Sequence, residues 1–410
     1  MAGIANGGPG IDVRRLKQNL ASAKDGAILF IYTVPLTQED GSPMASSSDI
    51  IVGQLSPRKG RGALSNRASR CQPTHVEWED GVSGASPVTE CRAVMARSII
   101  ATNHSPDIPF SQSINPYQGC EHGCIYCYAR PTHAYLDLSP GVDFETRLTY
   151  KHNAARQLRR ELSHPGYRCA SITLGANTDP YQPVEKTYRI TRQLLAVLQS
   201  SRHPVAIITK GTLICRDLDI LAEMAADGLC SVAISITTLD DELKRALEPR
   251  APSARARLTA MNTLAAAGIP VSVLVAPVIP ALNDGDLESI LAHSRDAGAT
   301  RAGYLLLRLP LEVRELFYEW LRQHYPLRAD HVISLLRQCR DGADYDSRFG
   351  HRMRGTGIFA ELLARRFRVS CRKLAIETGE TAPLRTDLFS PPPPEPPSTG
   401  QTTARQFELF

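Results

Sequence analysis

The feature that most constrains the fold is an alternation of apolar runs and amphipathic stretches between about residues 170 and 309. Nearly continuous apolar runs fit strands of a parallel sheet that is buried on both faces, and the stretches between them have helical periodicity. The predicted strands are "ASITLGA" from Ala170, "VAIITK" at 205–210, "SVAISI" at 231–236, "VSVLVAPVI" at 271–279 and "RAGYLLLRL" at 301–309. The predicted helices cover 184–199, 217–227 and 286–297, and a fourth helix begins at its cap Ser253 and ends at Gly268.

One more βα unit precedes this alternation. The segment "FSQSIN" at 110–115 supplies a first strand, and "NAARQLRREL" at 153–162 supplies its helix. Six βα units over about 200 residues predict an α/β fold with an open, partial (β/α)6 TIM-like barrel. Beyond Leu309, three amphipathic stretches predict a small C-terminal helical appendage: "LEVRELFYEWLRQHYP", "ADHVISLLRQCR" and "GIFAELLARRF".

Composition separates the ends of the chain from this core. Residues 1–55 are rich in Gly, Ser and Ala without sustained periodicity, and we expect them to be disordered. We expect 56–110 to be a basic extension packed on the core, followed by the barrel at 111–310 and the helical region at 311–380. The tail at 381–410 contains "SPPPPEPPSTG", which is typical of an extended polyproline spacer.

Charge and apolar content limit the class of protein. The net charge of +5 is mild, but five basic side chains and no acidic one lie between Ser56 and Arg70, and a second basic cluster spans 365–373. Such clusters are either solvated faces or a patch for a polyanion. No run approaches the ~18 apolar residues of a membrane helix. Ten cysteines without a secretory signal indicate a reducing cytoplasm, where clustered thiols bind metals or do chemistry.

Three of those cysteines lie within eight residues, in "NPYQGCEHGCIYCYAR" at 115–130. Cys120, Cys124 and Cys127 follow the first predicted strand, and the carboxyl ends of parallel strands are where active sites form. A structural zinc could recruit His122 or His133, but such sites usually combine two spaced pairs, and no second CxxC exists. The remaining interpretation is an iron–sulfur cluster in which one iron lacks a protein thiolate and keeps an open position.

This CxxxCxxC loop resembles the signature of the radical S-adenosylmethionine (SAM) superfamily, and more narrowly its spore photoproduct lyase-like branch. The resemblance covers about residues 56–375 and also rests on "KGRGALSN" (59–66), "GANTDPYQPVE" (175–185), "EPRAPSARARL" (248–258) and "APVIPALND" (276–284). It implies a [4Fe-4S] cluster that binds SAM at its free iron. One electron, from a flavodoxin- or ferredoxin-type donor, then cleaves the sulfur–C5′ bond, and a 5′-deoxyadenosyl radical abstracts hydrogen from a substrate.

The resemblance also implies contacts to SAM. Tyr126 corresponds to an aromatic residue near the adenine, and Asn177, Thr178 and Asp179 follow the second strand, where the methionine ammonium binds. The remaining contacts are Lys210 to the methionine carboxylate, Ser235 to the ribose or carboxylate, and Asn283 near the adenosine. The alternative for each polar residue is a turn or capping role. For Glu248, Arg250 and Arg257 we favour a structural ion pair.

The substrate is less constrained. Spore photoproduct lyase repairs a thymine dimer in DNA with a hydrogen-donating cysteine near the end of the second strand, but this chain reads "GANTD" there. Cys169 lies about six residues upstream, roughly 20 Å away along an extended strand. The resemblance therefore implies the radical chemistry and not the repair of that lesion.

The C-terminus carries a second pointer to nucleic acid. "QFELF" resembles the peptide by which replication and repair proteins dock on the DNA sliding clamp, with Gln406, Leu409 and Phe410 as contacts; the alternative is a plain apolar tail. With the basic clusters, this motif makes DNA the leading substrate class, in repair or modification. The alternatives are a radical enzyme acting on a peptide or small molecule, and a non-catalytic iron–sulfur protein.

Overall fold

The computed structural model describes residues 57–67, 70–71, 88–379 and 383–393. The predicted disordered segment at 1–55 and the clamp-like terminal motif lie outside the described residues. No helix in the described part of the chain is both long and apolar enough to cross a membrane.

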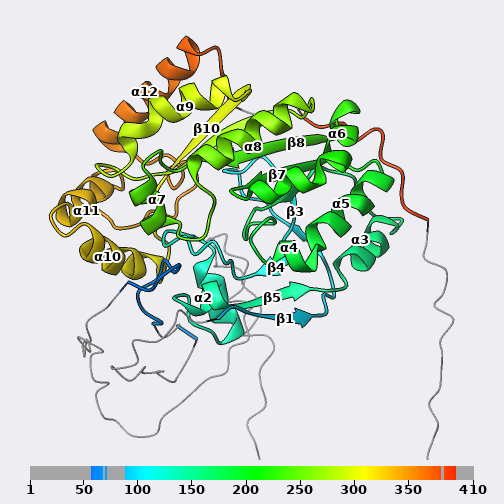
Figure 1. Cartoon of the computed structure of the whole chain (residues 1–410), viewed down its shortest axis with the longest axis horizontal. Coiled ribbons are helices and arrows are strands. Elements are labelled where there is room, and N and C mark those ends of the chain that lie inside the picture. The colour runs from blue at the N-terminus through cyan, green and yellow to red at the C-terminus, as the bar shows by residue number, and fades with distance from the viewer. Residues whose placement is uncertain (1–56, 68–69, 72–87, 380–382, 394–410) are drawn as a thin grey trace, which may run out of the picture. The chain divides into compact units, whose positions relative to one another are not determined.

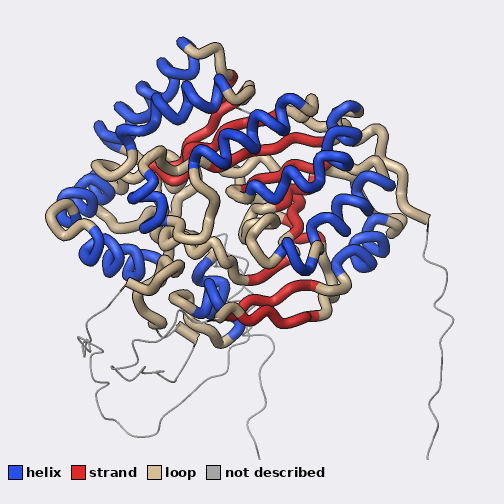
Figure 2. Tube along the Cα trace, viewed as in Figure 1, coloured by secondary structure: helices blue, strands red, loops and turns tan. Residues whose placement is uncertain are grey.

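The centre of the described fold is an eight-stranded sheet in the order β11-β10-β9-β8-β7-β6-β3-β2 (Figures 1 and 2). Each neighbouring pair is parallel except β2–β3, which is antiparallel. The strands are β2 (Ile100–Thr102), β3 (Gln112–Ile114), β6 (Ile172–Leu174), β7 (Val205–Thr209), β8 (Cys230–Ser235), β9 (Val271–Val278), β10 (Arg301–Leu306) and β11 (Glu377–Thr378). The six strands from β3 to β10 confirm the predicted partial barrel.

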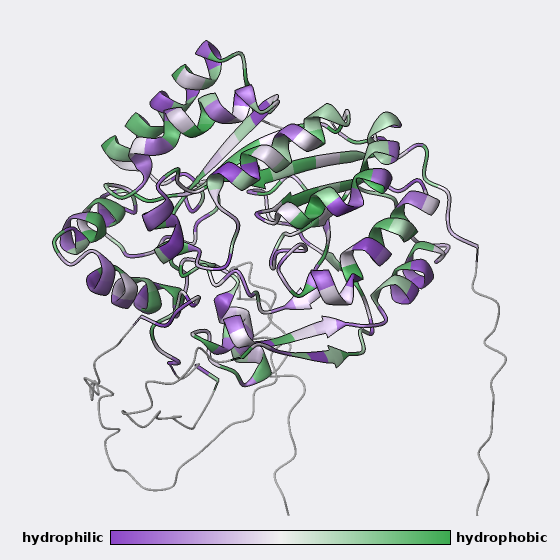
Figure 3. Cartoon of the chain, in the orientation of Figure 1, coloured by the Kyte–Doolittle hydropathy of each residue, from purple (hydrophilic) through white to green (hydrophobic). Residues whose placement is uncertain are grey.

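Helices lie between these strands along the chain, and part of them packs on the sheet. They are α2 (Asp143–Thr146), α3 (Ala154–Leu162), α4 (Glu185–Tyr188), α5 (Ile190–Ser200), α6 (Leu218–Ala226), α7 (Asp241–Leu247), α8 (Ala254–Ala266) and α9 (Leu287–Asp296), with 3-10 turns η1 (Arg130–Leu136), η2 (Thr212–Asp217) and η3 (Asp284–Asp286). Figure 3 shows β7 and β8 as mainly hydrophobic and the helices as mixed, with polar residues among apolar ones. One large apolar cluster joins the strands to α3, α5, α6, α8 and α9.

The predicted caps of α8 are confirmed. The Ser253 Oγ accepts a hydrogen bond from the Ala256 amide at 3.2 Å, which satisfies one of the free amides of the first turn. Gly268 follows the helix with φ of +78°, a conformation that glycine adopts without a Cβ clash.

The single helix predicted at 184–199 is wrong, because the structure has two helices there. Arg189 lies between α4 and α5 with φ of +52°. The Glu185 carboxylate accepts hydrogen bonds from the amides of Thr191 and Arg192, at 3.0 and 3.4 Å. A carboxylate at the first amides stabilises the start of α5, so the break is held by the side chain of the residue that begins α4.

A second, three-stranded sheet was not predicted. It has the order β1-β5-β4, with β1 (Glu90–Val94) parallel to β5 (Arg147–Lys151) and β4 (Tyr117–Gln118) antiparallel to β5. The strands are short and half exposed, and their partners lie far apart in the sequence, so periodicity does not reveal the pairing. This sheet borders the cysteine loop, because β4 ends two residues before Cys120.

The C-terminal helices divide between two cores. Helices α10 (Val313–His324) and α11 (Ala329–Gln338) share an apolar cluster with the cysteine loop, centred on the buried Trp320. Helix α12 (Gly357–Lys373) packs on the barrel instead, with the ring of Phe367 4.8 Å from that of Tyr304 on β10. The predicted appendage is therefore α10 and α11, while α12 belongs to the outer layer of the barrel.

Candidate active site

The cysteine loop runs from β4 into η1, and its thiols are mostly enclosed. Cys120 and Cys124 are buried and Cys127 is half-buried. Two tight turns shape the loop: the Gly123 amide donates to the Cys120 carbonyl at 3.3 Å, and the Cys127 amide donates to the Cys124 carbonyl at 3.2 Å. Gly119 and Gly123 have φ of +77° and +68°, and at both positions a Cβ would lie 2.9 Å or closer to an oxygen atom, so the turns require glycine.

The three thiols share one environment. Burial raises the pKa of each, that of Cys124 to about 12. The neighbouring charges of Asp179, Cys124 and Cys127 raise the pKa of Cys120 further. The thiols of Cys120, Cys124 and Cys127 are therefore close enough to interact with one another.

The donor groups of the loop are three thiols, with two histidines nearby in the sequence. Among the described residues, no three His, Cys, Asp or Glu side chains converge as they would on one ion. Thiolates that bind different irons of one cluster need not converge on a point. The two histidines considered as zinc ligands have other contacts: His133 Nε2 is 2.9 Å from the Arg147 carbonyl, and His122 Nδ1 is 3.4 Å from Asp179 Oδ2.

A buried arginine holds the loop from within. The Arg130 guanidinium donates to the carbonyls of Gly123 and Cys124, at 3.2 and 2.9 Å, and to the carbonyls of residues 140 and 141. It also forms a 2.5 Å ion pair with Glu145 on α2, and both side chains are fully buried. Arg130 therefore satisfies the loop carbonyls that no secondary structure reaches.

The motif "KGRGALSN" packs on the outside of the same loop. The Glu145 carboxylate accepts hydrogen bonds from the amides of Gly62 and Ala63, at 3.0 and 2.9 Å. A Cβ on Gly62 would lie 1.8 Å from the Gly123 carbonyl oxygen, so the two backbones are in direct contact. Asn66 exchanges two hydrogen bonds with Asp143, which fixes the other end of the motif to α2.

The motif "GANTDPYQPVE" contacts the loop through a buried glutamine. Gln182 Nε2 donates to the Gly119 carbonyl at 3.1 Å, and its Oε1 accepts from the Glu121 amide at 2.9 Å. The backbone of 119–121 thereby obtains the pairing that a neighbouring strand would otherwise supply.

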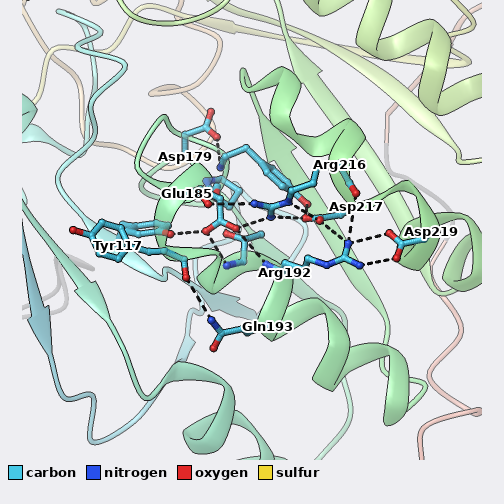
Figure 4. A network of polar contacts seen from close by, with 12 residues as sticks. Tyr117, Asp179, Glu185, Arg192, Gln193, Arg216, Asp217 and Asp219 are labelled. Carbon is cyan, nitrogen blue, oxygen red and sulfur yellow. Dashed lines mark hydrogen bonds and ion pairs between the residues drawn. The ribbon is translucent and has the colours of Figure 1, made fainter.

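A network of ion pairs and hydrogen bonds holds Glu185, the last residue of this motif (Figure 4). The Glu185 carboxylate accepts from the Tyr117 hydroxyl at 2.5 Å and from Arg216 at 2.7 Å. Asp217 pairs with Arg216 at 2.8 Å and with Arg192 at 2.9 Å. Glu185 and Asp217 are fully buried, so two arginines compensate two buried carboxylates, and the loop after β6 has a rigid base.

A second buried network positions Tyr126. Its hydroxyl donates to the Glu248 carboxylate, which also accepts from the Thr237 hydroxyl at 2.6 Å and pairs with Arg257. Burial acts to raise the pKa of Glu248, but the charges of Arg257 and Lys210 outweigh it and lower the pKa to about 2. The ion pair predicted for Glu248 and Arg257 is confirmed.

The third residue of that prediction pairs elsewhere. Arg250 contacts Glu121 in the cysteine loop at 3.0 Å, and the Arg250 amide donates to the His122 carbonyl at 3.2 Å. The motif "EPRAPSARARL" therefore contacts both the loop and Tyr126.

The residues expected to bind the methionine ammonium have diverse roles. Asp179 accepts from the amides of Tyr181 and Lys210 and from the Thr209 hydroxyl, at 2.9, 2.7 and 2.6 Å. Burial acts to raise its pKa, but His122 and these donors hold it well below its ordinary value. Thr178 is buried and donates to the Tyr117 carbonyl at 2.9 Å. Asn177 is half-buried, and its amide donates to Asn115 Oδ1 at 3.1 Å.

The remaining predicted contacts also follow barrel strands. The Lys210 ammonium, after β7, lies 5.8 Å from the centre of the Tyr126 ring. Ser235 ends β8, is buried, and accepts from Arg257 through its carbonyl at 2.9 Å. Asn283, after β9, accepts from the Ile279 amide at 2.6 Å and donates to the carbonyls of Thr237 and Pro277, at 2.7 and 2.9 Å. Asn283 thus locks the turn after β9.

Three structural residues escaped the sequence interpretation: Arg130, Glu145 and Gln182. Arg130 and Gln182 lie inside two quoted motifs, and their presence there was the available signal. Glu145 lies outside every motif, within the short helix α2 that was not predicted, and the sequence held no signal for it.

Comparison with known proteins agrees with this site. The radical SAM superfamily profile matches residues 114–293. A Mycobacterium tuberculosis (strain H37Rv) protein of uncharacterised function is 42% identical over 233 residues, which cover 56% of this chain and 68% of that protein. An uncharacterised protein of Methanocaldococcus jannaschii is 28% identical over 213 residues, 52% of this chain and 76% of the relative.

Among solved structures, a point variant of spore photoproduct lyase aligns with a TM-score of 0.50 and 14% identity, over 76% of this chain and 88% of that one. At this identity the likeness supports the fold alone. The chain belongs to the radical SAM superfamily, and it is a radical SAM enzyme.

Proposed function

We propose that Cys120, Cys124 and Cys127 hold a [4Fe-4S] cluster whose remaining iron binds SAM. The observation that carries this proposal is the convergence of separate parts of the chain on one thiol-bearing loop. Gly62, Gln182 and Arg250 come from three distant motifs and each contacts the loop backbone. Such support fixes a set of ligands before any cofactor binds.

When bound, the cluster supplies one electron that cleaves SAM, and the resulting 5′-deoxyadenosyl radical abstracts hydrogen from the substrate. The protein's own residues orient the cofactor. Lys210 is suited to the methionine carboxylate, since in the described part of the chain its ammonium contacts an aromatic face and no carboxylate lies within ion-pair distance. Tyr126 is suited to the adenine, because Glu248 and Thr237 fix its hydroxyl and leave the ring in a set orientation.

Asn177 and Ser235 complete the proposed SAM contacts. For Asp179, Thr178 and Asn283 we propose an indirect role, since their polar atoms hold the loops that carry Lys210, Asn177 and the end of β9. These residues position others and do not themselves need to touch SAM.

We propose a nucleic acid as the substrate class, in DNA repair or modification, with a flavodoxin- or ferredoxin-type protein as electron donor. What supports this class is the basic composition of 56–70 and 365–373 and the terminal "QFELF". The proposal does not include lesion chemistry that needs a thiol near the end of the second barrel strand, β6. The segment 175–179 after this strand contains no cysteine, and Cys169 precedes β6. A peptide or small molecule is the alternative substrate.

The test compares Cys124→Ala with Cys230→Ala, a buried cysteine on β8 that lies outside the loop. After anaerobic reconstitution we measure iron and sulfide per chain, and 5′-deoxyadenosine formed from SAM with dithionite. We expect the Cys124 variant to lose both, because it lacks one of three ligands, and the Cys230 variant to keep both.

Two outcomes count against the proposal. If Cys124→Ala retains its iron and its turnover of SAM, the ligand assignment is wrong. If the wild-type protein binds four irons but forms no 5′-deoxyadenosine, the chain carries a cluster without this chemistry.

A further inference from the structure

Arg308 is a half-buried cation that has no matching anion within the part of the chain that the structure describes. It follows β10 by two residues. Its Nη2 is 3.3 Å from the Tyr345 hydroxyl and its Nη1 is 3.5 Å from the Met353 sulfur, while its buried Nε has no hydrogen-bond partner in the described ranges of the chain. Among the described residues, no carboxylate lies within ion-pair distance of Arg308.

This arrangement differs from that of two enclosed arginines near the cysteine loop. Arg130 and Arg257 each pair with a buried carboxylate, at Glu145 and Glu248. Removing a guanidinium from water without a counter-charge is unfavourable, and an unsatisfied Nε adds to the cost. A site that retains such a group is expected to have an anionic ligand that repays it.

The surroundings of Arg308 add positive charge. Arg340 is buried and donates to the carbonyls of His351 and Leu307, at 2.8 and 3.0 Å. Burial lowers the pKa of Arg340, and the charge of nearby Arg308 acts in the same direction. His351 Nδ1 is another buried nitrogen that has no hydrogen-bond partner among the residues with a described position.

Arg308 also lies beside the proposed active site. Its guanidinium is 5.6 Å from the centre of the Tyr128 ring, and Tyr128 directly follows Cys127. The Tyr128 hydroxyl donates to the Ala176 carbonyl, after β6. Tyr128 therefore links Ala176, two residues after β6, to Arg308, two residues after β10, and 45% of its surface remains exposed.

We propose that Arg308 binds a phosphate group of the substrate, with the exposed face of Tyr128 available for stacking a base of the same nucleotide strand. This inference rests on the proposed function and names its substrate class. A phosphate offers several acceptor oxygens to the Arg308 guanidinium and the Tyr345 hydroxyl. An aromatic face beside a phosphate-binding cation is the usual arrangement for single-stranded nucleic acids. A carboxylate would satisfy the charge but leave the ring without a role.

The experiment measures, by fluorescence anisotropy, how a labelled single-stranded oligonucleotide of eight residues binds to the reconstituted full chain. The salt concentration is varied from about 50 to about 200 mM, a range that includes physiological ionic strength. We compare Arg308→Gln, Arg308→Lys and the matched control Arg156→Gln, which removes an exposed arginine on α3. Arg308→Gln is expected to weaken binding about tenfold or more and to lower the salt slope by about 0.7, the loss of one contact to single-stranded phosphate.

Arg308→Lys is expected to bind with intermediate affinity, because it keeps the charge and loses the planar fork. Arg156→Gln is expected to bind like the wild type. If Arg308→Gln does not fold, as judged by its urea midpoint, Arg308→Lys still decides the matter, since unchanged affinity in that variant contradicts the guanidinium contact.

Several results overturn the inference: wild-type affinity and salt slope in Arg308→Gln, an equal loss in Arg156→Gln, or no oligonucleotide binding by the wild type. If an octaglutamate peptide displaces the labelled oligonucleotide at a lower concentration than unlabelled oligonucleotide does, the site is assigned to carboxylates instead. SAM cleavage without substrate is measured in parallel, and Arg156→Gln, whose exposed side chain on α3 lies outside the site, is the variant expected to leave it unchanged. If oligonucleotide binding depends on Arg308 but the wild-type protein does not cleave SAM, the proposed chemistry is refuted while the phosphate-binding site at Arg308 stands.

Discussion

Replacing Arg130 by methionine tests whether this side chain holds the cysteine loop in place. The change removes donors to four carbonyls and the ion-pair partner of the fully buried Glu145, while the charge of Arg61 remains near that carboxylate. Two amides, from Gly62 and Ala63, would still bind the carboxylate. Breaking one side of a buried pair costs about 3–5 kcal/mol, and at a slope of about 3 kcal/mol per molar the urea midpoint should fall by about 1.3 M.

The assay is urea unfolding of the metal-free protein under reducing conditions, followed by circular dichroism. The matched control is Arg156→Met on the exposed face of α3, which should shift the midpoint by less than about 0.2 M, as surface substitutions usually do. The urea midpoint of Arg130→Lys should lie between those of Arg130→Met and Arg156→Met, because lysine restores the charge but cannot reach four carbonyls at once.

A double variant separates the ion pair from the packing. Arg130→Met combined with Glu145→Met should lose less stability than the sum of the single losses, since the buried carboxylate is removed together with its ion-pair partner. A midpoint change below about 0.3 M in Arg130→Met, or strict additivity in the double variant, would refute the role assigned to the pair. Reconstituted Arg130→Met is also expected to hold less iron per chain.

Two further predictions concern acid stability and the terminal motif. The pKa of Glu248 is about 2, against its ordinary value of 4.5, so its contribution to the free energy of unfolding is complete above pH 4.5 and is lost as the pH falls toward 2. Over this pH window the urea midpoint should fall more steeply in the wild type than in Glu248→Gln. Parallel curves for the two proteins would contradict the assignment. A peptide of residues 401–410 should bind a bacterial sliding clamp in an anisotropy assay and lose binding when Leu409 and Phe410 become alanine, and equal binding by both peptides would remove the support from this motif.

The barrel was predictable because its strands are apolar without interruption and its helices have local signals. Ser253 and Gly268 mark the ends of α8 by the conformations they favour, which depend on near neighbours alone. The break at Arg189 was not predictable, since it depends on Glu185 turning back to the amides of α5. The pairing of β1 with β5 depends on contacts more than fifty residues apart, which periodicity does not encode.

The sequence singles out the three thiols of the cysteine loop, and the structure encloses them together, while their surroundings were less predictable. Asp179 and Asn283 were expected to contact SAM, with a turn role as the alternative, and the structure places their polar atoms on neighbouring amides and carbonyls. A carboxylate or amide at the end of a strand can serve either purpose, and only the position of nearby backbone donors distinguishes them. Arg308 had no sequence signal at all, because an arginine after a strand is ordinary until its lack of a counter-charge is seen.

The motifs that made the chain resemble a family have a common physical purpose. The cysteine loop cannot pair as helix or sheet, since Gly119 and Gly123 turn it tightly, and its buried backbone still needs hydrogen-bond partners. Gln182 serves the carbonyl of 119 and the amide of 121, and Arg130 serves the carbonyls of 123 and 124. Each substitution in these partners would leave a buried group unsatisfied in the loop itself. The spacing of the cysteines therefore specifies the ligands, and the distant motifs specify the loop that holds them.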